Sequence, residues 1–210
     1  MLLCIIQART GSTRFPGKVL HKHDGAPLID HVYGTCKHIF TNVIVAIPMG
    51  DKELKRHLYD SCIPCFEGPE NDVLKRYYMC ARTYEANHVV RVTGDCPFIW
   101  PDTLHYMTHL MLSGDKSRFH FASNAFGDRT YPDGTDCELM SMECLSWLND
   151  NAKSDADREH VTKYLYEHIN EFNKHFGPPG AIKFNLPVNL SHLKFSIDTK
   201  EDLERWTSKK

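Results

Sequence analysis

LLCIIQARTGSTRFPGK, residues 2–18, is the stretch from which the architecture of this chain can be read. Its apolar start is far too short to span a bilayer and lacks the basic n-region and cleavage site of a secretion signal, so it predicts a buried strand. The residues after this strand include two glycines, three hydroxyl side chains and the cations Arg9, Arg14 and Lys18. Glycine lets backbone N–H groups approach an anion, and the cations add positive charge, so the loop is suited to polyphosphate. A solvated basic turn is the alternative that composition leaves open.

The loop is not one of the common nucleotide motifs. The segment from Gly11 to Lys18 comes close to the P-loop pattern, but Gly11 and Gly17 lie one residue too far apart and Val19 replaces the Ser or Thr. The dinucleotide fingerprint is also absent. The position of the loop directly after a predicted strand is therefore what favours phosphate binding over a solvated turn.

Strand-like and helix-like runs alternate after residue 18, which is typical of βα units and predicts an α/β fold with a mostly parallel sheet. We expect strands at 2–7, 43–47, 63–66, 88–92, 119–123, 137–140, 182–185 and 194–197. We expect helices at 27–38, 51–60, 71–84, 101–112, 142–150 and 155–172, and a last helix that begins at Thr199.

Two aspartates follow predicted strands at distant points of the chain. Asp95 comes after strand 88–92 within Thr93-Gly94-Asp95, and Asp198 comes after strand 194–197. Because ligands bind at the carboxyl ends of strands in open α/β sheets, both aspartates can face the loop after strand 2–7. Two convergent carboxylates would hold Mg²⁺ (or Mn²⁺) and leave coordination positions for waters and phosphate oxygens. For each aspartate, a helix N-cap role is the structural alternative.

Composition narrows the class of protein. Lys+Arg 25 against Asp+Glu 27 gives a net charge of -2, so no global field attracts nucleic acid or an anionic membrane. No apolar run reaches the length of a membrane span, and the eight scattered cysteines are typical of reduced thiols in the cytoplasm. The Cys62-Ile63-Pro64-Cys65 segment lacks the second ligand pair that a structural zinc site needs. We expect one cytoplasmic domain over residues 1–210 that binds neither nucleic acid nor membrane.

Six segments resemble, in order and spacing, the cytidylyltransferase family, which includes 3-deoxy-manno-octulosonate, acylneuraminate and spore-coat polysaccharide cytidylyltransferases. They are IIQARTGSTRFPGKVL, EGPENDVLKRYY, VVRVTGDCPFI, TYPDGTDCE, REHVTKYLYEH and FSIDTKEDLE. The resemblance covers nearly the whole chain, and spore-coat proteins are the nearest match. It implies a Rossmann-like, glycosyltransferase-A-like fold with a mixed sheet flanked by helices. Residues 1–100 would bind CTP, and residues 101–210 would bind the acceptor and supply the second metal aspartate.

The resemblance also implies roles for individual residues. Arg14, Lys18 and Asp95 would be catalytic, and Asp95 and Asp198 would hold the metal ion. Nucleotide contacts would come from two segments: Ala8, Arg9, Gly11, Ser12, Asn71 and Asp72. The family's sugar-acid enzymes carry longer acceptor and dimerisation segments, whereas this chain ends about a dozen residues after Asp198, so it is expected to lack them. A homodimer is a family expectation only.

The expected reaction is cytidylylation, in which an acceptor oxygen attacks the α-phosphorus of CTP and pyrophosphate leaves. A sugar acid and a phosphorylated small molecule are equally credible acceptors, in a pathway that builds a polysaccharide or glycan. If the acceptor carries a carboxylate or phosphate, its oxygen is already anionic and no general base is needed. Acceptor contacts are expected from Asp136, Glu138, Arg158 and His160. Solvated acids on an edge strand and surface charge are the respective alternatives.

Two other functions remain open at this point. A nucleotide-sugar glycosyltransferase would use a similar fold, but such enzymes usually show Asp-x-Asp at the metal strand, and Asp95-Cys96-Pro97 lacks the second Asp. A catalytically silent nucleotide-binding module would have little reason to keep Arg14, Lys18, Asp95 and Asp198 together.

Overall fold

The computed structural model describes residues 1–113 and 119–207 and contains a seven-stranded sheet in the order β5-β4-β1-β6-β8-β7-β9. The strands are β1 (Leu2–Gln7), β4 (Val43–Pro48), β5 (Cys65–Gly68), β6 (His88–Thr93), β7 (Phe121–Ser123), β8 (Glu138–Ser141) and β9 (Ala181–Lys183). Strands β5, β4, β1 and β6 pair in parallel, whereas β8 runs antiparallel to its neighbours β6 and β7. The predicted mostly parallel mixed sheet is confirmed, and the ends of its seven strands lie within two residues of the predicted ends.

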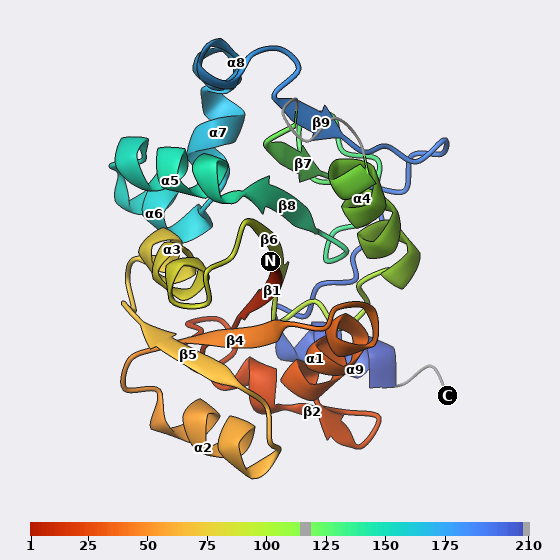
Figure 1. Ribbon diagram of the computed structural model, residues 1–210. Coiled ribbons are helices and arrows are strands. Elements are labelled where there is room, and N and C mark those ends of the chain that lie inside the picture. The colour runs from red at the N-terminus through yellow and green to blue at the C-terminus, as the bar shows by residue number, and fades with distance from the viewer. Residues whose placement is uncertain (114–118, 208–210) are drawn as a thin grey trace.

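Helices cover both faces of this sheet (Figure 1). The helices are α1 (Leu28–Ile39), α2 (Lys52–Asp60), α3 (Val73–Thr83), α4 (Pro101–Ser113), α5 (Met142–Asn151), α6 (Asp155–His160), α7 (Lys163–Glu167), α8 (Ile169–Phe176) and α9 (Lys200–Thr207), with the 3₁₀ turn η1 (Lys18–Leu20). A two-stranded hairpin, β2 (Lys22–His23) and β3 (Ala26–Pro27), precedes α1. None of the helices within the described ranges has the length and apolar character needed to cross a bilayer.

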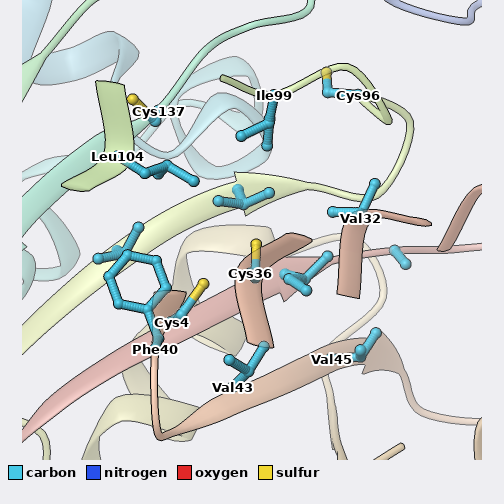
Figure 2. Close-up of a cluster of buried hydrophobic side chains, with 14 of the residues drawn as sticks. Cys4, Val32, Cys36, Phe40, Val43, Val45, Cys96, Ile99, Leu104 and Cys137 are labelled. Carbon is cyan, nitrogen blue, oxygen red and sulfur yellow. The ribbon is translucent and has the colours of Figure 1, made fainter. Parts of the chain in front are cut away.

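The two sides of β1 belong to two different hydrophobic clusters, because successive strand residues point to opposite faces. Cys4 and Ile6 pack with the helices α1, α2 and α4, whereas Leu3 and Ile5 pack with α3, α5, α7 and α8. Figure 2 shows the first cluster, where Cys4 and Cys36 lie between β1 and α1. β1 is therefore buried on both faces, which fixes the loop that follows it.

The prediction of one long helix at 155–172 was wrong. The chain forms α6, α7 and α8 instead, and it breaks first at Val161, which has φ 56 and ψ -64. The Thr162 N–H donates to the carbonyl of His160 at 2.6 Å, so Val161 is the centre of a three-residue γ-turn. Thr162 Oγ1 also donates to the buried carboxylate of Glu138 at 2.8 Å. Periodicity cannot reveal this break, because a tertiary contact causes it.

The strand predicted at 194–197 was also wrong, since this segment has only an isolated bridge between Asp133 and Lys194. The N–H groups of Phe195 and Ser196 both donate to the Asp133 carbonyl, at 2.6 and 3.2 Å. The Ile197 N–H donates to the carbonyl of Asp95 at 3.1 Å. The segment is extended as the pattern indicated, but its hydrogen bonds go to two loops and not to a strand ladder.

Candidate functional site

A polar cavity of about 350 Å³ lies at the carboxyl ends of β1 and β6, where ligands bind in open α/β sheets. Its volume falls within the range of small-molecule sites. Residues from the loop after β1, from β6, from the end of α6 and from the segment before α9 line it. They are Gln7, Ala8, Arg9, Ser12, Thr13, Arg14, Lys18, Val19, Arg91, Thr93, Asp95, Glu159, His160 and Asp198.

The loop after β1 is closed by the carbonyl of Thr10, which accepts the N–H groups of Ser12 and Gly17, each at 2.8 Å. Gly17 has φ +70, a left-handed conformation that favours glycine, and it ends the loop directly before η1. The chain turns there so that the Lys18 side chain points inward and is 11% exposed. The turn at Gly17 thus holds the Lys18 ammonium group in one position.

Lys18 joins the two distant aspartates. Its Nζ lies 2.5 Å from Asp95 Oδ2 and 3.2 Å from Asp198 Oδ1. A guanidinium nitrogen of Arg14 lies 3.1 Å from the same Asp198 oxygen. Burial by itself raises the pKa of Asp198, but Lys18, Arg14 and Lys194 outweigh it and hold this pKa below its ordinary value. Asp198 is therefore ionised at neutral pH.

Backbone contacts set the position of both aspartates. Gly94, which precedes Asp95, donates to the Gln7 carbonyl at 2.7 Å, and a Cβ atom at Gly94 would lie 3.0 Å from the Cβ of Ala8. The Asp198 N–H donates to the Asp202 carboxylate at 3.0 Å in the first turn of α9. Local contacts thus fix the position of each aspartate. The hydrogen bond from the Ile197 N–H to the Asp95 carbonyl joins the two loops.

The donor set at this point fits one hard divalent cation. The carboxylates of Asp95 and Asp198 converge on a single ammonium group, so both can reach one small cation. Within the described ranges no group of three or more His, Cys, Asp or Glu side chains could hold a metal, so a cation here would take two carboxylates from the protein. Mg²⁺ is typically bound in this way, through one or two carboxylates and substrate phosphates.

Three of the predicted nucleotide contacts lie outside the cavity lining. Gly11 lies on the other side of the loop, where a Cβ atom would approach Glu70. Asn71 is exposed, and Asp72 is the N-cap of α3 through a hydrogen bond from the N–H of Lys75 at 2.8 Å. The structure brings together Ala8, Arg9, Ser12, Arg14, Lys18, Asp95 and Asp198.

Of the predicted acceptor contacts, only His160 lines the cavity. Arg158 is 15% exposed and forms a two-pronged ion pair with Asp72 at 2.9 and 2.7 Å. Glu138 is 2% exposed and lies on a central strand, where it pairs with Arg91 at 2.7 Å. Burial raises the pKa of Asp136 to about 6 although Arg129 pairs with it.

Sequence reasoning missed several residues of the cavity wall. Arg91 and Thr93 alternate with the buried residues Val90 and Val92 along β6 and lead directly to Asp95. This two-residue period is a signal that could have identified them. Glu159 gave no such signal, because its contact with Arg9, at 3.1 Å, joins residues that lie 150 positions apart in the chain.

A larger hollow of about 440 Å³ lies at the opposite end of the sheet, between α1 and α4. It is lined by Leu2, Thr41, His105, His109 and neighbouring residues, and among the described residues no carboxylate, lysine or arginine lines it. The polar cavity is the better candidate because its charged groups match a nucleotide triphosphate.

Comparison with known proteins agrees with this site and fold. The cytidylyltransferase family model matches residues 3–207. The chain is 32% identical to the spore coat polysaccharide biosynthesis protein SpsF of Bacillus subtilis, over 97% of this chain and 83% of that protein.

Solved structures show the same likeness. A cytidylyltransferase from Leptospira borgpetersenii has a TM-score of 0.89 and 29% identity, over 99% of this chain and 85% of that chain. CMP:2-keto-3-deoxy-manno-octonic acid synthetase, solved in complex with CTP, has a TM-score of 0.73 and 17% identity, over 99% and 97% of the two chains, which shows a shared fold. With a matching family model, a close relative and a matching fold, this chain belongs to the cytidylyltransferase family of CTP-dependent nucleotidyltransferases.

Proposed function

We propose that the polar cavity transfers CMP from CTP to a small sugar acid or phosphorylated acceptor and releases pyrophosphate, in a pathway that builds a polysaccharide or glycan. The single observation that carries this proposal is the convergence of the basic loop after β1 with two carboxylates, through Lys18, Asp95 and Asp198. SpsF, whose printed name refers to spore coat polysaccharide biosynthesis, supports the pathway class.

In the proposed reaction an acceptor oxygen forms a bond to the α-phosphorus while the bond from this phosphorus to the bridging oxygen of pyrophosphate breaks. Ser12, Arg9 and Arg14 hold the triphosphate, and Ala8 packs beside the cytosine. The cations Arg14 and Lys18 stabilise the charge that grows on the departing pyrophosphate. His160 contacts the acceptor from the cavity wall.

Asp95 and Asp198 are the residues that would hold a divalent cation, Mg²⁺ or Mn²⁺. When bound, such an ion neutralises phosphate charge and helps to orient the α-phosphate. In this proposal Lys18 moves from the two carboxylates toward the triphosphate when nucleotide and cation bind. Its contacts of 2.5 and 3.2 Å with Asp95 and Asp198 support this proposal, because the ammonium group lies beside the residues that would hold the cation.

The donor and the acceptor can be tested together by measuring pyrophosphate release with each of the four ribonucleoside triphosphates, Mg²⁺ or Mn²⁺, and a panel of sugar acids and phosphorylated alcohols. We expect turnover with CTP alone. Turnover with another triphosphate in preference to CTP would contradict the donor, and CTP binding without turnover on any acceptor would favour the catalytically silent module.

Substitution of the converging residues tests their roles. We expect Lys18→Ala and Asp95→Ala each to lower kcat/KM for CTP by about a hundredfold or more, because each removes a charge fixed beside the phosphates. The thermal unfolding temperature should change by only a few degrees. Lys200→Ala and Asp60→Ala are matched controls, since these side chains are 74% and 63% exposed outside the cavity. Wild-type turnover in Lys18→Ala or Asp95→Ala would refute the assigned roles.

A further inference from the structure

Asp51, at the end of the turn that follows β4, binds the basic loop after β1 although it does not line the cavity. Its Oδ2 accepts the backbone N–H of Thr10 at 2.8 Å, and its Oδ1 accepts the Thr10 hydroxyl at 2.9 Å. Oδ1 also accepts the N–H of Leu54 at 3.2 Å and so forms the N-cap of α2. An N-cap needs only one side-chain oxygen. The second oxygen is therefore committed to the loop.

Thr10 is the residue through which this contact reaches the rest of the loop. Its carbonyl accepts the N–H groups of Ser12 and Gly17, so all its backbone and side-chain polar groups are hydrogen-bonded. Gly17 in turn precedes Lys18, whose side chain lies between the two aspartates. A chain of direct contacts thus runs from Asp51 through Thr10 to the segment that carries Ser12 and Lys18.

The sheet order explains why Asp51 can reach the loop. β4 is the parallel neighbour of β1, with Gln7 opposite Ala46, and the Ala8 N–H donates to the Ala46 carbonyl at 3.2 Å. The turn after β4 therefore begins beside the loop after β1. Gly50, with φ +90, reverses the chain so that Asp51 faces Thr10.

A carboxylate beside a loop that binds polyphosphate repels the phosphates, because like charges repel. Its presence is explained if its hydrogen bonds to the loop offset this repulsion. Both oxygens of Asp51 face N–H and O–H donors and none faces the cavity. A carboxylate that accepts such donors makes stronger hydrogen bonds than a neutral acceptor. The contact is therefore suited to holding a flexible basic loop in one conformation.

We propose that Asp51 is a positioning residue for cytidylyl transfer, which holds Thr10 so that Ser12 and Lys18 meet the triphosphate in the correct geometry. This inference rests on the proposed function. It assigns to the turn after β4 a role in catalysis beyond capping α2, and Asp51 acts through Thr10 without touching the substrate.

Asp51→Ser separates the two tasks of the residue, because serine is also a good N-cap but has one oxygen and a shorter reach. We expect kcat/KM for CTP to fall by roughly tenfold to hundredfold, since displacement of a binding loop by about an ångström has effects of this size. The unfolding temperature should stay within a few degrees of the wild type. Ser141→Ala is the matched control: it removes the N-cap of α5, far along the chain from the loop, and should lower the unfolding temperature without changing the CTP kinetics.

Two substitutions of Thr10 provide an independent arm. Thr10→Val removes the hydroxyl but keeps the N–H, so it should lower kcat/KM, and the double variant with Asp51→Ser should lose less than the product of the two single losses, because the residues act as a unit. Thr10→Ser restores the hydroxyl and should recover most of the loss seen in Thr10→Val.

Calorimetric titration with CTP and Mg²⁺ completes the design. If Asp51→Ser binds and turns over CTP like the wild type, or if its effects multiply independently with those of Thr10→Val, Asp51 is only a helix cap and the inference is refuted. A wild-type chain that neither binds nor turns over CTP would instead refute the proposed function, and this inference with it.

Discussion

Gly134 is fixed by a contact to another loop and not by its own turn alone. It has φ +88, and a Cβ atom at this residue would lie 2.1 Å from the backbone nitrogen of Ser196. The preceding residue, Asp133, accepts the Ser196 hydroxyl at 2.7 Å through its carboxylate. This close backbone approach supports the segment that ends in Asp198.

Gly134→Ala should therefore disturb the site as well as the fold. We expect a loss of about 2–4 kcal/mol in the free energy of unfolding, because both the backbone conformation and the space exclude a side chain. The added methyl must push Ser196 away, so the Mg²⁺ concentration needed for half-maximal turnover should also rise. Urea unfolding and a Mg²⁺ titration of turnover measure the two effects.

Gly25→Ala is the control for Gly134→Ala. Gly25 has φ +86, but nothing lies within 4 Å of its Cβ position. Gly25→Ala should lower the free energy of unfolding by only about 1 kcal/mol, from backbone strain alone. Its turnover should keep the wild-type dependence on Mg²⁺ concentration. Equal effects of the two substitutions would show that the contact with Ser196 is unimportant.

At the scale of elements, α3 and α6 are joined through one carboxylate. Asp72 caps α3 and also pairs with Arg158 of α6, which donates further to the carbonyl and side chain of Asn149. Arg158 directly precedes Glu159 and His160, which line the cavity. The ion pair thus sets the position of one cavity wall.

Substitution of Asp72 can separate capping from the ion pair. Asp72→Ser keeps the N-cap but leaves Arg158 without its carboxylate, and we expect a loss of about 2 kcal/mol in the free energy of unfolding. Asp72→Ala should lower the free energy of unfolding by about 1 kcal/mol more, because it also removes the N-cap of α3. Chemical denaturation of both variants measures this difference, and equal losses would contradict the capping role. A raised KM for CTP in folded Asp72→Ser would support the role of the ion pair in positioning the cavity wall.

The sequence allowed the elements of the first half to be predicted more closely than those of the second. β1 and β4 are nearly continuous apolar runs, β6 alternates buried valines with polar residues, and α1 has a clear amphipathic period, so local patterns suffice there. The break at Val161 depends on Glu138, 23 residues earlier in the chain, and the hydrogen bonds of residues 195–197 go to Asp133 and Asp95. No local pattern contains these partners.

The same distinction holds for the site. The meeting of the basic loop with Asp95 was predictable, because the parallel strands β1 and β6 end at one edge of the sheet. Asp198 reaches the same place from an extended segment that is not a strand, so its prediction rested on a strand that the structure lacks. The burial of Glu138 and the pairing of Arg158 with Asp72 could not be predicted. The sequence does not indicate whether a charged side chain is solvated or paired with a distant residue.

At the scale of the whole molecule, an aromatic cluster joins the two loops that carry the aspartates. Phe98 lies three residues after Asp95, Phe195 lies three residues before Asp198, and Trp206 of α9 contacts both, with ring centroids 4.4 and 5.0 Å away. Helix α9, whose place in the fold Figure 1 shows, therefore packs against both loops that carry the two aspartates. This packing links two walls of the cavity that lie far apart in the sequence.

Trp206→Ala should weaken this support. We expect a loss of about 1–3 kcal/mol in the free energy of unfolding, since a half-buried aromatic side chain is removed, together with a several-fold rise in the Mg²⁺ concentration needed for turnover. Trp147→Ala is a matched control, because Trp147 is also half-buried and packs with Phe172 and Phe176 away from the cavity. It should be destabilised to a similar degree without the change in Mg²⁺ dependence. If both variants shift this dependence alike, the cluster has no special link to the site.

The distance along the chain between Asp95 and Asp198 has a consequence for biosynthesis. A ribosome must translate beyond codon 198, and α9 must emerge and dock, before the second carboxylate can join the first. The nascent polypeptide can assemble β1, β4 and β6 much earlier, but in that state Lys18 has only one of its two carboxylate partners. The two carboxylates can therefore meet only after residue 198 has left the ribosome, long after β1, β4 and β6 have been made.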